Sequence, residues 1–208
     1  MSFNGFERKD FDTFNIEDLD GRMAKIQERI QPKFHAIAEV VTPALSEITG
    51  RDIYLHVARH ARRKVNPPAD TWSSYCHNKR GYKQHPHFQI GLFDDHVFIW
   101  LAFIYELPQK QEIAERLIEE QATIEEHIPG DFMISLDHTK KDAQALKDAD
   151  LDAGLKRFRD VKKGEFLIGR QLDANDSIVK DGEAFIEHVL ETFKTLTPVY
   201  QLAMRDNG

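Results

Sequence analysis

The sequence predicts an α+β fold with a mainly antiparallel sheet of about five to six strands and helices packed chiefly on one face. Segments with apolar residues at every third or fourth position lie near both ends of the chain, as in amphipathic helices. Between them the apolar period changes to two, and three or four strands follow one another without a crossover helix, which disfavours a doubly wound parallel sheet. No Ser/Gly-rich linker divides the chain, so a single domain is expected over residues 1–208.

The first long helix is expected to begin near Asp18, where apolar residues start to recur at helical spacing. Pro32 and Pro43 should kink or divide it, and Gly50 should cap its C-terminus in a left-handed conformation. The apolar stripe consists of Met23, Ile26, Ile30, Phe34, Ile37, Val41, Leu45 and Ile48.

Strands are expected next. Residues 53–58 and 88–92 alternate between apolar and polar side chains, which is typical of half-buried strands, and residues 71–76 form a weaker candidate. Asp94-Asp95 should form a tight turn into residues 97–105, a run that is apolar on both faces and therefore indicates a central strand.

The second half of the chain predicts helices that alternate with single strands. A helix is expected from about Pro108 to His127, a strand over residues 132–137, and one or two short helices over residues 143–161. A further strand over residues 164–170 precedes a last helix that should bend near Pro198.

Composition excludes several classes of protein. Apolar residues make up 41% of the chain and charged residues 30%, as in globular proteins. The N-terminus is charged where a secretory signal would be apolar, and the longest apolar run, residues 97–105, is about half of a membrane span. A lone cysteine, Cys76, excludes an internal disulfide framework. We therefore expect a cytoplasmic protein without a membrane partner.

Charge is distributed unevenly along the chain. The net charge is −7, yet residues 51–83 hold eight Lys and Arg residues against two Asp residues. Such an asymmetry indicates association with an anion. The alternative is that these cations pair with the acidic helix around residues 115–126 or simply face solvent.

Four segments carry a resemblance to a known family: HVARHARRKVNPPADTW, NKRGYKQHPHFQIG, the LDH of residues 136–138 and the VKKGEF of residues 161–166. Together with the N-terminal FERKDFDTFNIEDLDGRM, they resemble the YktB-like family of small proteins from Bacillus-type bacteria, over essentially the whole chain. The resemblance implies a fold similar to the catalytic core of biotin ligases and class II aminoacyl-tRNA synthetases. It assigns no catalytic role to any residue, and fold likeness alone does not assign function.

A basic connector, residues 59–71, is expected to join two strands. Pro67-Pro68 stiffens it, so that little entropy is lost when it binds a ligand, and its arginines can pair bidentately with phosphate or carboxylate. A second basic turn surrounds Tyr82, which, like Trp72, could stack on a base. The candidate ligand-binding residues are Arg62, Arg63, Lys64, Trp72, Lys79, Arg80, Tyr82, Lys83, Tyr54 and Gln89.

Strand parity also predicts a polar face of the sheet beside the connector. Tyr54, His56, His87 and Gln89 should lie on the side opposite the buried apolar residues. Candidate groups for proton transfer there are His56, His87 and Asp137. An antiparallel sheet with one solvated face gives the same alternation without any site, so both interpretations stay open.

No metal site is predicted, and whether the protein takes a cofactor stays unknown. His85 and His87 have a spacing that suits zinc on a strand, but Pro86 disrupts the strand and no third ligand is apparent. In the family pattern the residues at 84–87 are Met-Leu-Pro-His, so a site built on His85 would not be a family property. The sequence contains no nucleophile elbow, phosphate-binding glycine loop or dinucleotide fingerprint.

These patterns lead to three functional hypotheses. The first is a protein that binds an anionic or phosphate-bearing ligand, a nucleotide or RNA, at the basic connector. The second is an enzyme that uses the same surface, with His56 or His87 as acid or base. The third is an interaction or scaffold protein without small-molecule activity. The identity of the ligand, the oligomeric state and whether the protein is an enzyme stay open.

Overall fold

The fold is built around one seven-stranded antiparallel sheet, and this confirms the predicted α+β class. The structure, a computed structural model, describes residues 2–205. The strands follow the order β1-β2-β3-β4-β7-β5-β6 across the sheet. Their bounds are β1 Tyr54–Val57, β2 Thr71–Cys76, β3 His87–Leu92, β4 His96–Phe103, β5 Met133–Ser135, β6 Gln144–Ala145 and β7 Phe166–Asp173.

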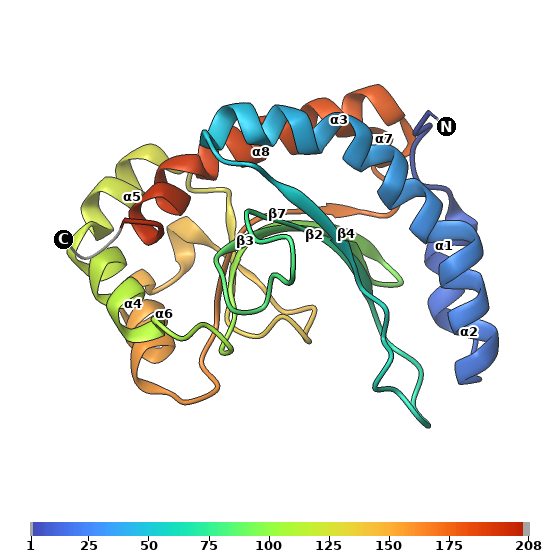
Figure 1. The fold of residues 1–208 in the computed structure, drawn as a ribbon, viewed down its shortest axis with the longest axis horizontal. Coiled ribbons are helices and arrows are strands. Elements are labelled where there is room, and N and C mark those ends of the chain that lie inside the picture. The colour runs from blue at the N-terminus through green and yellow to red at the C-terminus, as the bar shows by residue number, and fades with distance from the viewer. Residues whose placement is uncertain (1, 206–208) are drawn as a thin grey trace.

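The two longest helices, α3 and α8, run across one face of the sheet, with α4, α5 and α6 packed towards one end and α1 and α2 towards the other (Figure 1). The α-helices are α1 Arg8–Phe11, α2 Leu19–Lys25, α3 Gln31–Thr49, α4 Lys110–Glu119, α5 Gln121–His127, α6 Leu151–Asp160, α7 Ser177–Lys180 and α8 Gly182–Ala203. A π-helical turn at Ile26–Ile30 and 3₁₀ turns at Asp12–Asn15 and Leu146–Asp148 complete the set. None of the helices in the described part of the chain is long and apolar enough to cross a membrane.

The main core lies between the sheet and these helices. Strand parity places alternate strand residues on this side, among them Phe88 of β3 and Val97, Ile99, Leu101 and Phe103 of β4. The ring of Phe88 packs 4.7 Å from that of Phe193 and 5.1 Å from that of Tyr200, both on α8. Burial of these large apolar side chains is the main source of stability for such a layer.

The helix expected from Asp18 is interrupted just before Pro32 but not at Pro43. Its N-terminal part is α2, a π-helical turn follows at Ile26–Ile30, and α3 begins just before Pro32. Proline fits the first turn of a helix because the amide that it lacks would have no intrahelical partner there. Pro43 lies inside α3, and Gly50 caps that helix with φ at 67°, in the left-handed region, as predicted.

Other differences are small. The expected helix 108–127 is divided at Glu120 into α4 and α5, and α8 continues through Pro198. The seventh strand, β6, is only two residues long and pairs with β5. An element that short has no periodicity, so it could not be seen in the sequence.

The opposite face of the sheet is not covered by the long helices α3 and α8 (Figure 1). A smaller apolar cluster lies there, formed by Phe93, Phe98, Trp100, Ala102, Ile104 and Leu167. Trp72 packs against its edge. Beyond Trp72, towards β1, this face carries polar and aromatic side chains and is bordered by the connector between β1 and β2.

Candidate functional site

Hydrogen bonds anchor both ends of the connector, where it leaves β1 and where it enters β2. Ala58 donates its backbone N–H to the carbonyl of Trp72 at 2.9 Å, and Arg22 of α2 donates to the carbonyl of Pro68 at 2.7 Å. Between these anchors the chain turns at His60, which has φ at 49°, and Arg62 and Arg63 are exposed. The connector extends from the body of the molecule between β1 and β2, as predicted from the strand pattern (Figure 1).

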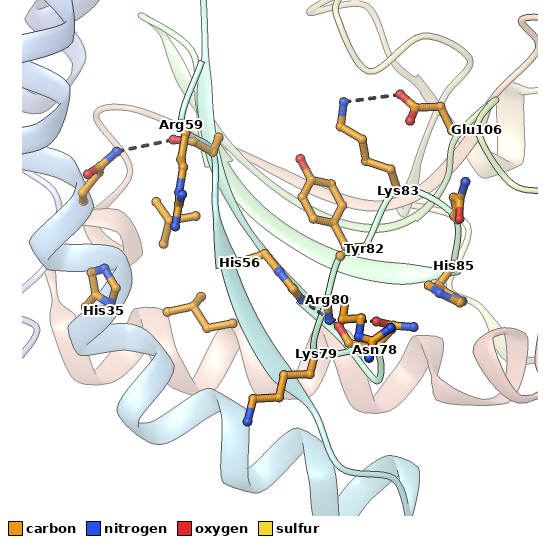
Figure 2. Close-up of a pocket in the computed structure, with 16 residues that line it drawn as sticks. His35, His56, Arg59, Asn78, Lys79, Arg80, Tyr82, Lys83, His85 and Glu106 are labelled. Carbon is orange, nitrogen blue, oxygen red and sulfur yellow. Dashed lines mark hydrogen bonds and ion pairs between the residues drawn. The ribbon is translucent and has the colours of Figure 1, made fainter. Parts of the chain in front are cut away.

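A large cavity, which we call the sheet groove, lies between α3, β1 and the turn that contains Lys79, Arg80 and Tyr82. Its volume is about 1120 Å³. Figure 2 shows His56 and Tyr82 in the middle of the groove, Lys79 and Arg80 on the turn, and Lys83 reaching towards Glu106. Strand β1 supplies His56, and α3 supplies His35 at the far wall.

A second cavity of about 600 Å³, the connector cavity, lies under the connector. It shares Ala58, Arg59, Tyr82 and Lys83 with the sheet groove, so the two cavities adjoin. The residues that line the connector cavity but not the sheet groove include His60, Arg62, Arg63, Asp70, Trp72 and His138. Two of the predicted connector arginines and both predicted stacking rings therefore border one hollow.

The cations of this surface are largely unneutralised. Within residues 2–205, no carboxylate lies within 4.0 Å of the side-chain nitrogens of Arg59, Arg62, Arg63, Lys79 or Arg80. Lys83 is the exception, because its Nζ atom lies 3.3 Å from Oε1 of Glu106. The alternative in which the acidic helix around residues 115–126 neutralises the connector is therefore wrong.

Tyr82 is held between the two cavities by contacts on three sides. Its hydroxyl accepts a hydrogen bond from Nε1 of Trp72 at 3.1 Å, and its ring lies 4.8 Å from the ring of His87 and 5.7 Å from that of His56. An aromatic ring fixed in this way loses little entropy when a flat ligand stacks on it.

His87, whose ring packs against that of Tyr82, is fully buried. Its Nδ1 atom donates to the carbonyl of His85 at 2.8 Å, and its Nε2 atom accepts from the amide of Gln89 at 2.8 Å. Burial lowers the pKa of His87 to about 3. With both ring nitrogens engaged and the ring neutral, His87 is suited to positioning Tyr82.

His56 occupies a more accessible place. Its Nε2 atom lies 2.9 Å from the carbonyl of Asn78, which ties β1 to the basic turn. Nε2 therefore donates to this carbonyl and does not face the groove as a free base.

Three groups that the sequence did not indicate meet at the connector cavity. Oε2 of Glu165, which directly precedes β7, accepts hydrogen bonds from the backbone N–H of His138 at 2.9 Å and from its Nδ1 atom at 2.7 Å. Glu165 is buried, and the ring of His138 lies 6.1 Å from that of Trp72. Asp70, also buried, lines the same cavity as His138.

The environments of Asp70 and His138 raise the pKa values of both groups. Burial raises the pKa of Asp70 to about 6, although the positive charges of His138 and Arg63 oppose this. Burial lowers the pKa of His138, but the hydrogen bond that His138 donates to Glu165 and the negative charges of Glu165, Asp70 and Asp137 outweigh it, so the pKa of His138 is raised.

One group of side chains has the spacing of metal ligands. Atoms of Asp137, His138 and Glu165 lie within 4.8 Å of one another. The Nδ1 atom of His138 already donates to Glu165, however, and Oδ1 of Asp137 accepts from the backbone and hydroxyl of Thr139 at 2.9 and 2.6 Å. An ion would have to replace these hydrogen bonds, so we assign the His138–Glu165 pair as a hydrogen-bonded dyad. The absence of a metal stays a prediction.

Comparison with known proteins places the chain in a family. Residues 6–200 match the family described as Domain of unknown function (DUF1054). The chain belongs to this family. It is 52% identical to the UPF0637 protein of Shouchella clausii, over 98% of this chain and 97% of that protein. The UPF0637 protein of Oceanobacillus iheyensis is 54% identical over 97% of each chain, and that of Listeria innocua is 50% identical over 99% of this chain and all of its own.

The YktB-like family indicated by the sequence is this same DUF1054 family, so that prediction is confirmed. The names of these relatives state no activity or ligand. The geometry of the site is therefore the basis for assigning a function to this DUF1054 protein.

Not every predicted site residue of this DUF1054 protein borders the two cavities. Lys64 is exposed on the connector, and Tyr54 lies beside the sheet groove with Nζ of Lys79 6.0 Å from its ring centre. Gln89 is buried with His87. Asp137 lines a separate cavity of about 510 Å³ near α6. The remaining candidates are brought together, and their role in binding stays a prediction.

Proposed function

We propose that the protein binds a phosphate-bearing ligand, a nucleotide or a short segment of RNA, along the sheet groove and the connector cavity. The observation that carries the proposal is that no carboxylate lies within 4.0 Å of the side-chain nitrogens of Arg59, Arg62, Arg63, Lys79 or Arg80 in residues 2–205, in a chain with 35 acidic residues. Like charges gathered on one surface repel one another, and an anionic ligand removes that repulsion.

The chemistry of the cations fits phosphate. The guanidinium groups of Arg62 and Arg63 present planar forks of N–H donors, which bind two phosphate oxygens at once. Lysine offers a single point charge, so Lys79 and Lys83 would add affinity with less geometric demand. Pro67 and Pro68 restrict the connector before any ligand arrives, which limits the entropy lost on binding.

The aromatic residues favour a ligand with a base. Trp72 and Tyr82 are half-buried, they are fixed to each other by a hydrogen bond, and both line the connector cavity. Stacking of a base on such a ring contributes about 1–3 kcal/mol. Free inorganic phosphate could use only the cations, so a nucleotide should bind more tightly than phosphate.

The overall charge of −7 limits the length of nucleic acid that the surface can hold. A long strand would pass from the basic surface onto acidic surroundings and be repelled there. A cavity of about 600 Å³ lies in the range typical of small-molecule sites. Mononucleotides and short single strands are therefore the expected ligands.

The test is a thermal-shift and fluorescence titration with inorganic phosphate, pyrophosphate, purine and pyrimidine mononucleotides, and a short single-stranded RNA. A ligand of the native state raises the melting temperature, and stacking should quench the fluorescence of Trp72. Affinity should fall as salt concentration rises, because phosphate contacts release counterions.

The matched variants remove two positive charges each. Arg62→Ala/Arg63→Ala should lose binding of the nucleotide or RNA. Lys180→Ala/Lys194→Ala, at exposed positions of α7 and α8 with no ion pair within residues 2–205, should bind as the wild type does. No binding by any probe, or equal loss in both double variants, would contradict the proposal and leave the scaffold hypothesis, which predicts a salt-sensitive change in oligomeric size.

A further inference from the structure

The connector cavity contains acid and base groups that anion binding does not require. Asp70 and His138 both line it, and Glu165 lies behind His138. A purely electrostatic site for phosphate would have no use for buried carboxylates, because they repel the ligand. Their presence beside Arg62 and Arg63 needs a separate explanation.

Glu165 fixes the orientation of His138. Its side chain is only 4% exposed, and its Oε2 atom accepts both from the backbone N–H of His138 and from Nδ1 of the ring. The proton on Nδ1 is therefore held by Glu165, and Nε2 is the ring nitrogen left to exchange protons with a ligand. A buried carboxylate behind an imidazole holds the ring in one tautomer and stabilises its protonated form.

Asp70 provides the second group. Its carboxylate is buried at the start of β2, and within residues 2–205 no other residue donates a hydrogen bond to it. An ionisable group that is buried without a partner is costly to folding. Such a cost is commonly retained at sites where the group acts on a ligand.

We propose that the connector cavity hydrolyses a phosphodiester, with Asp70 and His138 exchanging protons with the reacting oxygens while Glu165 positions His138. This inference rests on the proposed function, because Arg62 and Arg63 have to hold the phosphate. It deepens that function by naming the substrate class and the reacting groups.

The reaction is balanced with water as the only co-reactant. Asp70 takes a proton from water, and the water oxygen forms a bond to phosphorus. The bond from phosphorus to one ester oxygen breaks, and that oxygen takes the proton from Nε2 of His138. The products are an alcohol and a phosphomonoester, and transfer of the proton from Asp70 to His138 through solvent restores the starting state. Arg62 and Arg63 would stabilise the charge on the non-bridging oxygens.

The surrounding charges suit these roles near neutral pH. Asp70 and Asp137 favour a protonated His138, together with Glu165. Arg63 favours the ionised form of Asp70. Arg59 and Lys83 add positive charge to the lining. His60 and Tyr82 are neutral there, because burial lowers the pKa of His60 to about 4 and raises that of Tyr82. Turnover should therefore rise as Asp70 ionises above about pH 6 and fall as His138 loses its proton at higher pH.

The experiment measures turnover of bis(4-nitrophenyl) phosphate and of a short single-stranded RNA, beside the affinity for pyrophosphate. Asp70→Asn and His138→Gln should each lower kcat on the order of 10²- to 10⁴-fold while pyrophosphate still binds. Glu165→Gln should move the alkaline limb of the pH profile to lower pH, which a purely structural role would not do. His127→Ala, at an exposed position of α5, is the control and should turn over as the wild type does. Circular dichroism checks that each variant is folded.

Three outcomes would overturn the inference while leaving the proposed function intact. The first is pyrophosphate binding without turnover of either probe above the uncatalysed rate. The second is turnover that survives both Asp70→Asn and His138→Gln. The third is turnover that appears only when Zn²⁺ is added. If the wild type binds neither pyrophosphate nor any nucleotide or RNA probe, the proposed function is contradicted instead.

Discussion

The Nδ1 atom of His138 lies 2.7 Å from Oε2 of Glu165, and the two residues are separated by 27 positions in the chain. The glutamate side chain is 4% exposed and that of the histidine 22%. A hydrogen bond to an ionised group contributes about 1.5–3 kcal/mol in such surroundings. This contact fastens the 137–141 loop to the start of β7 and places His138 at the edge of the connector cavity.

Glu165→Gln should lower the pKa of His138. The substitution removes the negative charge that favours the imidazolium, whereas burial, which favours the neutral ring, remains. NMR titration of the His138 ring protons measures the pKa directly. Glu106→Gln, which removes the partner of Lys83 at the sheet groove, is the matched control and should leave the titration of His138 unchanged.

The raised pKa of His138 also has a consequence for stability. The folded state holds the proton of His138 more tightly than the unfolded state does. Its contribution is therefore complete below the unfolded pKa of about 6.5 and disappears as pH rises through the folded pKa. Urea unfolding of the wild type and Glu165→Gln should differ more at pH 6 than at high alkaline pH. A constant difference would contradict this assignment.

Asp70→Asn should stabilise the protein at neutral and alkaline pH. Burial raises the pKa of Asp70 from 3.8 to about 6, so the folded state keeps a proton that the unfolded state releases. Stability therefore falls as pH rises between these two values, by on the order of 3 kcal/mol at most. Asn keeps the shape of the side chain and cannot ionise. Urea unfolding across this pH range should show a weaker pH dependence in Asp70→Asn, and an unchanged dependence would contradict the prediction.

His87→Ala should destabilise the protein by roughly 2–4 kcal/mol, because it leaves a cavity and removes the partner of Gln89. Tyr82 also loses the ring beneath it, so nucleotide affinity should fall together with stability. Urea unfolding and nucleotide titration measure the two effects. The control is His127→Ala, an exposed substitution that should change stability by less than about 0.5 kcal/mol. An equal effect of both substitutions would show that His87 does not support the site.

The fold and half of the site follow from local pattern. Alternation around Ile53 and Phe88 places His56 and His87 on the same face because side chains of neighbouring strands in register share a face. The basic connector is predicted as a link between two strand patterns, and in the structure these two strands pair with each other. The shared face of His56 and His87 and the position of the connector can therefore be predicted from local periodicity.

The acid and base groups of the connector cavity could not be predicted in this way. Asp70 and Glu165 lie 95 positions apart and each stands next to a strand, where no repeating pattern marks it. His138 follows Asp137 directly, and adjacent strand residues point to opposite faces. Strand parity therefore selects Asp137 for the polar face and leaves out His138. The contact that matters, between His138 and Glu165, depends on β5 pairing with β7, which periodicity does not specify.

The N-terminal segment shows a similar limit. No sequence pattern marks Asp10 in FERKDFD for burial, yet Asp10 is fully buried and pairs with Lys33 of α3. Nζ of Lys33 lies 2.6 Å from Oδ2 of Asp10 and also donates to the carbonyl of Gly5 at 2.9 Å. One lysine thus fastens the N-terminal segment to the helix that forms a wall of the sheet groove.

Lys33→Met should destabilise the protein by about 3–5 kcal/mol, because it leaves the carboxylate of Asp10 buried without a counter-charge. Lys25→Met is the matched control, since Lys25 pairs with Glu28 at the surface and such pairs contribute about 0–1 kcal/mol. The double variant Lys33→Met/Asp10→Asn should lose less stability than the sum of its single substitutions, because the asparagine leaves no unpaired buried charge when Lys33 is replaced. Urea unfolding of the four variants measures this coupling. Strict additivity would show that Lys33 acts through its contact with Gly5 and not through Asp10.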